Sequence, residues 1–93
     1  MRDWYYIKGN RIYCKGEGSR EKGKALQRVV SGLKEGNFCY FWYEKGGWLF
    51  LKGKGGWLCL PLSEGDLPEE IRFKIMAVLD GIEKEVEKKW QLL

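Results

Sequence analysis

The chain has 93 residues, of which 44% are hydrophobic and 15% aromatic, so it is long enough for one domain over residues 1–93 and too short for two. Charged residues of both signs make up 32% and only two prolines occur, which argues against disorder. No apolar run approaches the roughly 18 residues of a membrane span, and the first ten residues lack the apolar stretch of a signal peptide. We therefore expect a cytoplasmic protein with no membrane contact.

Positive charge is concentrated in the first two thirds of the chain. Residues 1–62 hold twelve basic and five acidic side chains, whereas residues 63–93 hold five and eight. The first part should attract polyanions, and the last part should not.

Residues 4–15 predict a β-hairpin, because Gly9-Asn10 separates two runs rich in aromatic and β-branched residues. One face is then apolar, with Tyr5, Ile7, Ile12 and Cys14. The opposite face mixes rings and cations in three cross-strand pairs: Trp4 with Lys15, Tyr6 with Tyr13 and Lys8 with Arg11.

Apolar residues recur at helical spacing from Ser19 to about Leu33, with Ser19 as a plausible N-cap and Gly36 as a stop. On the outer side of this helix a basic row repeats every four residues: Arg20, Lys24 and Arg28. Like charges at this spacing repel unless an anion lies alongside. The alternative is a solvated basic face.

A near-repeat, KGGWLFL at 45–51 and KGGWLCL at 54–60, indicates two equivalent hairpin turns in a three-stranded meander over residues 37–62. If Gly46-Gly47 and Gly55-Gly56 form type I′ turns, Lys45 pairs with Trp48 and Lys54 with Trp57. Alternation then puts one set of residues in the core: Phe38, Tyr40, Trp42, Leu49, Leu51, Leu58, Leu60 and Leu62. The opposite side collects Phe41, Tyr43, Lys45, Trp48, Phe50, Lys52, Lys54 and Trp57. A three-residue first loop would instead exchange the two faces of the first strand.

Residues 66–92 predict one long helix with Asp66 as N-cap, Pro68 in the first turn and Glu69 completing a capping box. Its second half contains acidic and basic residues spaced to form ion pairs, such as Asp80 with Lys84. We expect residues 1–62 to form a basic sheet-and-helix body, with the first half of the long helix packed on it. The second half would join a homodimer or homotetramer, or, alternatively, lie wholly against its own sheet.

Motifs for catalysis or metal binding are weak. Residues 18–25, GSREKGKA, match part of a nucleotide-binding P-loop, but Ala25 replaces the hydroxyl that would hold magnesium. Histidine is absent, and the three cysteines form no C-x-x-C pair, so we expect no metal, no cofactor and no enzymatic activity. The cysteines fit small buried hydrophobes in a reducing compartment.

The interleaved rings and cations favour single-stranded DNA, or RNA, because bases stack on rings while cations neutralise phosphates, with little sequence preference. The candidate stacking residues are Tyr6, Tyr13, Trp48, Phe50 and Trp57. The candidate phosphate-binding residues are Lys8, Arg11, Arg20, Lys24, Arg28, Lys45, Lys52 and Lys54. Three alternatives remain: a second core covered by the first helix or a symmetry mate, a protein-interaction or inhibitor module, and a protein that coats duplex DNA.

The chain resembles the archaeal ThermoDBP and ThermoDBP-related single-stranded DNA-binding proteins in three features. These are the aromatic-basic hairpins at 4–15 and 37–62, the long helix from Asp66, and a composition without Thr and rich in Lys and Glu. The predicted elements together give an α+β fold with a five-stranded antiparallel sheet and two helices. The resemblance implies a thermophilic protein with a small antiparallel sheet and helices. It also implies an oligomer whose DNA path runs over Trp48, Trp57, Tyr6 and Tyr13.

Overall fold

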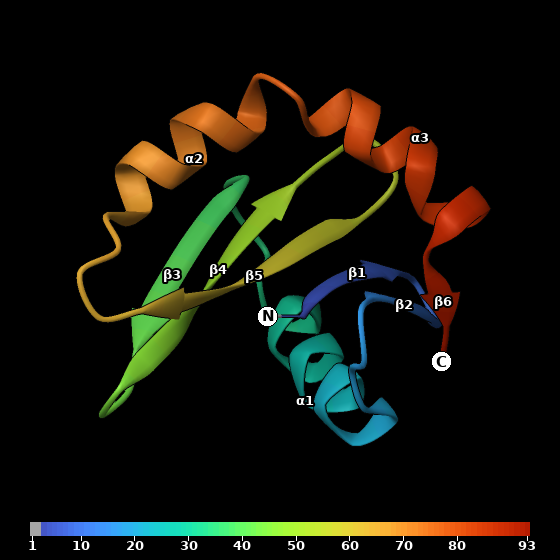
Figure 1. Ribbon diagram of the computed structural model, residues 1–93, viewed down its shortest axis with the longest axis horizontal. Coiled ribbons are helices and arrows are strands. Elements are labelled where there is room, and N and C mark those ends of the chain that lie inside the picture. Colours follow the sequence, from blue (N-terminus) through green and yellow to red (C-terminus); the bar gives the residue numbers. More distant parts are fainter. Residues whose placement is uncertain (1–2) are drawn as a thin grey trace.

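The computed structural model describes residues 3–93, and in these residues a six-stranded antiparallel sheet has helices on both faces (Figure 1). The α+β class with an antiparallel sheet is therefore confirmed. In chain order the elements are β1 (Trp4–Lys8), β2 (Arg11–Lys15), α1 (Arg20–Ser31), β3 (Phe38–Trp42), β4 (Gly46–Lys52), β5 (Trp57–Ser63), α2 (Pro68–Met76), α3 (Leu79–Lys89) and β6 (Gln91–Leu92). The strand order is β3-β4-β5-β1-β2-β6. Figure 1 shows α2 and α3 arching over one face, with α1 below the other.

The first hairpin has the register that the sequence predicts. Tyr6 lies opposite Tyr13 and Lys8 opposite Arg11. Gly9 has a φ of 59° in the turn, a left-handed conformation that favours glycine.

The meander is confirmed, but its Gly-Gly turns are wrong. Tyr43 N–H donates to the Gly46 carbonyl, and Gly53 N–H donates to that of Gly56, so the turn residues are 44–45 and 54–55. Gly47 lies within β4, where a Cβ atom would come within 2.1 Å of the Phe41 carbonyl oxygen. Gly46, Gly47 and Gly56 therefore permit close backbone approach, and none of the four paired glycines has the left-handed conformation expected of them.

Both shifts preserve the predicted faces, because each moves the pairing by an even number of residues. Tyr40 lies opposite Leu49, and Phe38 opposite Leu51, so the first strand keeps the face expected for two-residue loops. The alternative with exchanged faces is wrong. Tyr40 and Trp42 were expected in the core and are instead 41% and 43% exposed, because β3 is the edge strand of the sheet.

The two hairpin units meet where β1 pairs with β5, and this junction decides which faces combine. Tyr6 lies opposite Leu58, and Ile7 lies opposite Trp57. One buried cluster therefore joins Tyr6 and Tyr13 to the leucines of the meander and to the inner side of the C-terminal segment. Its other members are Leu49, Leu51, Leu58, Leu60 and Leu62 of the meander, with Leu79, Val86 and Trp90 of the C-terminal segment. The second cluster lies on the α1 side: Tyr5, Ile7, Ile12, Cys14, Leu26, Val30, Phe50 and Cys59.

Helix α1 begins as predicted, with the Ser19 side chain accepting a hydrogen bond from Lys22 N–H. It ends at Ser31, with Gly32 as the C-cap in place of Gly36. Leu26 and Val30 bury its inner face.

The single long C-terminal helix is wrong, because the chain forms two helices that meet at residues 77–78. A straight helix over 66–91 would measure about 39 Å at roughly 1.5 Å per residue, whereas the largest Cα extent of the protein is 31 Å. The break lets both helices follow the sheet, with Ile75 from α2 and Ile82 from α3 packed on one core.

The predicted cap of this segment is also wrong. Leu67 is the N-cap of α2, and the Asp66 carboxylate accepts a hydrogen bond from Ser63 N–H at 2.6 Å. Pro68 does occupy the first turn. The chain then ends with β6, a strand that the sequence did not predict.

The predicted ion pairs along α3 are present, with Lys84 Nζ 3.3 Å from Asp80 and Lys89 Nζ 3.8 Å from Glu85. Among residues 3–93, every helix is too short or too polar to cross a membrane.

Candidate nucleic-acid interface

Two half-buried tryptophans lie on the α1 side of the sheet. Trp48 projects from β4 and Trp57 from β5, while α1 packs mainly against β1 and β2. We call this surface the Trp face and define it by Phe41, Tyr43, Trp48, Lys52 and Trp57.

Neighbouring rings hold the Trp face in place. Trp48 meets the edge of Tyr5 at a centroid distance of 6.0 Å, and the Tyr5 hydroxyl accepts a hydrogen bond from Ser19 N–H at 2.9 Å. Phe41 stacks on the fully buried Phe50 at 5.5 Å. The exposed edges of the face therefore rest on packed aromatic side chains, which limits their freedom before any ligand binds.

Two lysines of this region are free of carboxylates. Lys52 lies opposite Trp57 in the ladder, with its Nζ 6.0 Å from the indole centroid. Lys45 is exposed in the β3–β4 turn, beside Tyr43, which is 59% exposed. Within the described residues 3–93, neither lysine forms an ion pair, so both ammonium groups are available to an anion.

Three predicted stacking residues are buried. Tyr6 is 3%, Tyr13 5% and Phe50 0% exposed. Tyr6 and Tyr13 also lie on the opposite face of the sheet from Trp48 and Trp57, so the expected path over all four rings is wrong. The cause is the β1–β5 register, which aligns Tyr6 with Leu58 and puts Trp57 beside Ile7.

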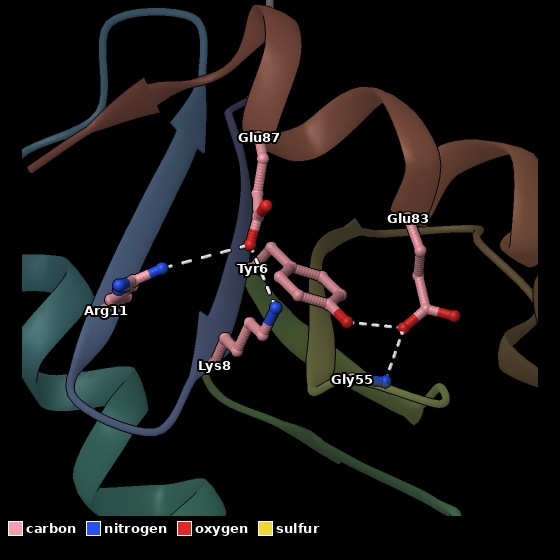
Figure 2. A network of polar contacts seen from close by, with 6 residues as sticks. All are labelled: Tyr6, Lys8, Arg11, Gly55, Glu83 and Glu87. Atoms are coloured by element: carbon pink, nitrogen blue, oxygen red, sulfur yellow. Dashed lines mark hydrogen bonds and ion pairs between the residues drawn. The ribbon is translucent and has the colours of Figure 1, made fainter.

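Three predicted phosphate-binding cations lie close to acids of α3. Lys8 Nζ is 2.9 Å from the Glu87 carboxylate, and Arg11 Nη1 is 4.0 Å from the same oxygen (Figure 2). The hydrogen bond between Lys8 and Glu87 raises the pKa of the lysine and lowers that of the carboxyl. Lys54 Nζ lies 3.9 Å from Asp80. The acids of α3 thus occupy the positions that we expected for nucleic-acid phosphates.

Glu83 of α3 binds the turn between β4 and β5. Figure 2 shows its carboxylate accepting hydrogen bonds from the Gly55 N–H, at 3.0 Å, and from the Tyr6 hydroxyl. The second oxygen accepts a hydrogen bond from the Lys54 N–H at 3.1 Å. Burial raises the pKa of Glu83, but the hydrogen bonds from Tyr6, Gly55 and Lys54 outweigh it, so the pKa lies below its ordinary value. Burial and the contact with Glu83 raise the pKa of Tyr6.

The basic row of α1 stands apart from the Trp face. Arg20, Lys24 and Arg28 are exposed, and their spacing puts them on the side of the helix away from the buried Leu26 and Val30. The structure therefore brings together Trp48, Trp57 and Lys52, with Lys45 at the end of the hairpin. The α1 row faces away from the sheet that carries them.

The P-loop-like segment is closed by its own side chains. Gly18 N–H donates to Cys14 Sγ at 3.1 Å, Ser19 N–H donates to the Tyr5 hydroxyl, and Lys22 N–H donates to the Ser19 hydroxyl. A Cβ atom on Gly18 would come within 2.2 Å of the Cys14 sulfur, so its N–H lies against packed protein.

The cysteines are free thiols, and two of the three are buried as expected. Burial raises the pKa of both Cys14 and Cys59. Cys39 is half-buried. Among residues 3–93, no cluster of three acidic or cysteine side chains could hold a metal ion.

Sequence reasoning did not assign a role to Glu83 or Glu87. Both lie on one side of α3, since they are four residues apart, and nearby cations offset the repulsion between like charges at this spacing. The spacing of the two glutamates therefore indicated a basic neighbour, but the sequence does not say which strand lies opposite the helix. Phe41 and Tyr43 were placed on the correct side of the sheet and were not chosen as site residues.

No protein-family model, curated protein or solved structure matches this chain.

Proposed function

We propose that this protein binds single-stranded nucleic acid, DNA in preference to RNA, on the Trp face and without catalysing a reaction. The observation that carries the proposal is the pair of half-buried indoles, Trp48 and Trp57, beside Lys52, whose ammonium group has no carboxylate partner within residues 3–93. Flat rings beside free cations suit bases and phosphates at once.

The spacing of the two indoles supports a separate stacking position on each. Trp57 lies opposite Lys52, which is four residues along β4 from Trp48. At about 3.4 Å per residue the two rings are therefore roughly 14 Å apart along the strands. Phe50 lies between them along β4 and is fully buried beneath neighbouring side chains such as Phe41, so this stretch offers packed apolar side chains and no third stacking ring.

Little sequence preference is expected of such a site. Every base presents a flat face to an indole, and hydrogen-bond readout would need polar side chains aimed at base edges. The Trp face consists of rings and lysine, so it supplies stacking and charge and no base-specific donor set.

Free thiols in the described chain suit the reducing cytoplasm.

The direct test is a fluorescence titration of the protein with oligo-dT at low salt. We expect quenching of the tryptophan emission and a linear fall of log K with log salt. If Lys45 and Lys52 neutralise one phosphate each, the slope is about −1.4, since each contact in a single strand contributes roughly −0.7.

Variants locate the binding surface. Trp57→Ala should weaken binding by about 5- to 150-fold, the equivalent of roughly 1 to 3 kcal/mol for one stacked base. Lys52→Gln should reduce the salt slope by about 0.7. The matched control is Lys8→Gln, which removes a cation held by Glu87 on the other face and should leave both quantities unchanged.

Two results contradict the proposal. One is the absence of quenching and of binding at low salt by folded protein, as judged by circular dichroism. The other is a loss of affinity in Lys8→Gln that equals the loss in Lys52→Gln. Competition with duplex DNA and with RNA of the same length then ranks the ligands, and stronger binding to duplex would favour a coating role.

A protein-interaction role is the second candidate, because exposed aromatic side chains also lie away from the Trp face. Tyr40 is 41% and Trp42 43% exposed on β3, and Phe73 is 82% exposed on α2. Aromatic side chains are frequent binding hot spots between proteins. A partner that remains bound after nuclease digestion and at high salt would favour this role.

A further inference from the structure

Strand β3 is an edge strand whose outer side has no partner among the described residues, since the strand order ends there. Asn37 and Tyr43, on either side of it, both bond inward: the Asn37 carbonyl accepts from Lys52 N–H, and Tyr43 N–H donates to Gly46. Inward and outward groups alternate along an antiparallel strand. The outward N–H and C=O groups therefore belong to Phe38, Tyr40 and Trp42.

This edge lacks the features that usually prevent two sheets from joining. The sequence of β3 is FCYFW, which contains no proline and no charged residue. All five residues pair regularly with β4. The opposite edge is β6, which has two residues. A regular aromatic edge strand of this kind favours addition of another strand.

The side chains beside this edge form an apolar patch on the face covered by α2. Tyr40 and Trp42 are exposed, and Tyr40 lies 5.6 Å from the ring of Phe38. The Arg72 guanidinium of α2 lies 4.4 Å above the Phe38 ring. A surface hollow beside Arg72 is lined by Phe73 and Met76, both of them exposed.

We propose that a second copy of this chain pairs its β3 antiparallel to this edge, on a two-fold axis through Tyr40. In this register Tyr40 lies opposite Tyr40 of the second copy, and Phe38 lies opposite Trp42. Each strand contributes three N–H and three C=O groups, so six hydrogen bonds form. Any other register loses at least one of the three residue pairs.

Charge and side-chain type both suit a second copy. Each end of the junction brings Lys34 toward Glu44 of the other copy, so opposite charges can meet while Lys45 remains available to an anion. Along the strand itself, aromatic residues face aromatic residues, a favourable cross-strand combination. The pairing is the same for both copies, so the assembly closes as a dimer.

This interface replaces the one that the sequence suggested. The second half of the predicted helix, which we expected to contact another subunit, has its apolar side chains Val86 and Trp90 buried against its own sheet. Four exposed apolar side chains lie on β3 and α2 instead: Tyr40, Trp42, Phe73 and Met76.

The dimer would extend the proposed binding surface. A two-fold axis perpendicular to the sheet keeps both Trp faces on the same side of one continuous sheet. The two β4 strands are then three strand spacings apart, about 14 Å, so Trp48 of each copy borders the junction. The pairing itself rests on β3 and does not depend on nucleic-acid binding.

The first experiment measures the mass of nuclease-treated protein in reducing buffer by sedimentation. We expect a concentration-dependent shift from 10.9 kDa to twice that value. Tyr40→Pro should give a monomer of unchanged circular dichroism, because the N–H that it removes points outward and not to β4. The matched control is Tyr43→Ser, which removes an exposed tyrosine outside the edge and should remain a dimer.

The second experiment tests the register in a Cys39→Ser background. Tyr40→Cys should form a disulfide-linked dimer under mild oxidation, since paired Cα atoms of this type lie about 5.5 Å apart, within the range of a disulfide. Trp42→Cys should not, because its copy lies about 14 Å away along the strand. A monomer at all concentrations, a dimer that persists in Tyr40→Pro, or equal cross-linking at both positions would overturn the proposal. None of these readouts involves nucleic acid.

Discussion

The carboxylate of Glu83 ties α3 to the β4–β5 turn and to Tyr6, and its replacement by glutamine should destabilise the fold. The change keeps the size of the side chain but removes the charge that three donors share. A hydrogen bond to a charged group contributes about 1.5 to 3 kcal/mol, and glutamine retains one acceptor oxygen. We expect Glu83→Gln to lower the free energy of unfolding by about 3 kcal/mol. In a chain of this size that loss corresponds to roughly 12 to 24 °C in Tm.

A double-mutant cycle in urea isolates the contact with Tyr6. Tyr6→Phe removes one donor and should cost about 1.5 kcal/mol, while Lys54 and Gly55 still bind the carboxylate. Since both changes remove the same hydrogen bond, the double variant should be more stable than the sum predicts by about 1 kcal/mol. Additivity within about 0.3 kcal/mol would refute this account of the contact.

The pH dependence provides an independent check. The folded pKa of Glu83 is lowered, so its contribution is complete above the unfolded value of about 4.3 and is lost as pH falls through the folded pKa. The folded pKa of Tyr6 is raised, so its contribution is complete below about 10 and is lost as pH rises further. The stability gap between wild type and Glu83→Gln should therefore close in acid. A constant gap down to pH 2 would contradict the assignment.

Three further outcomes are expected. Gly47→Ala should destabilise the protein strongly in thermal unfolding, because the new Cβ would lie about 2.1 Å from the Phe41 carbonyl oxygen; unchanged stability would argue against this packing. Gly81→Ala in α3 meets no atom within 4 Å and should stabilise the protein by about 0.5 to 1 kcal/mol, so a loss would contradict the helix. In thiol titration of native protein, Cys39 should react first and Cys59 only on unfolding, since burial raises the pKa of Cys59; rapid reaction of all thiols would contradict that burial.

Local patterns predicted the strands and their faces well. The turn at Gly9-Asn10 determined the first register, because the alternation on both sides of it agrees with only one pairing. The meander turns were misplaced since the paired glycines suggested left-handed turns. Gly47 instead serves a close backbone approach, which depends on the neighbouring strand and has no signature in the local sequence.

The candidate site depended on a contact between segments far apart in the chain. Whether Tyr6 shares a face with Trp57 or with Leu58 is decided by the register of β1 on β5, which lie about fifty residues apart in sequence. No hydrophobic period encodes that choice, because both faces of both hairpins are rich in apolar residues. The break at Val78 was missed for a similar reason, as the apolar spacing of 71–86 suits one bent helix pair as well as one straight helix.

The two helices that meet at Val78 differ in how many of their residues are buried against the sheet. Helix α2 buries none of its residues fully, whereas α3 buries Leu79 and Val86 and adds the contacts of Glu83. Segments with few buried contacts open at lower free energy than the rest of a fold. Amide protons of α2 should therefore exchange with deuterium well before those of α3, and α2 can lift from the sheet as a unit while the rest of the protein stays folded.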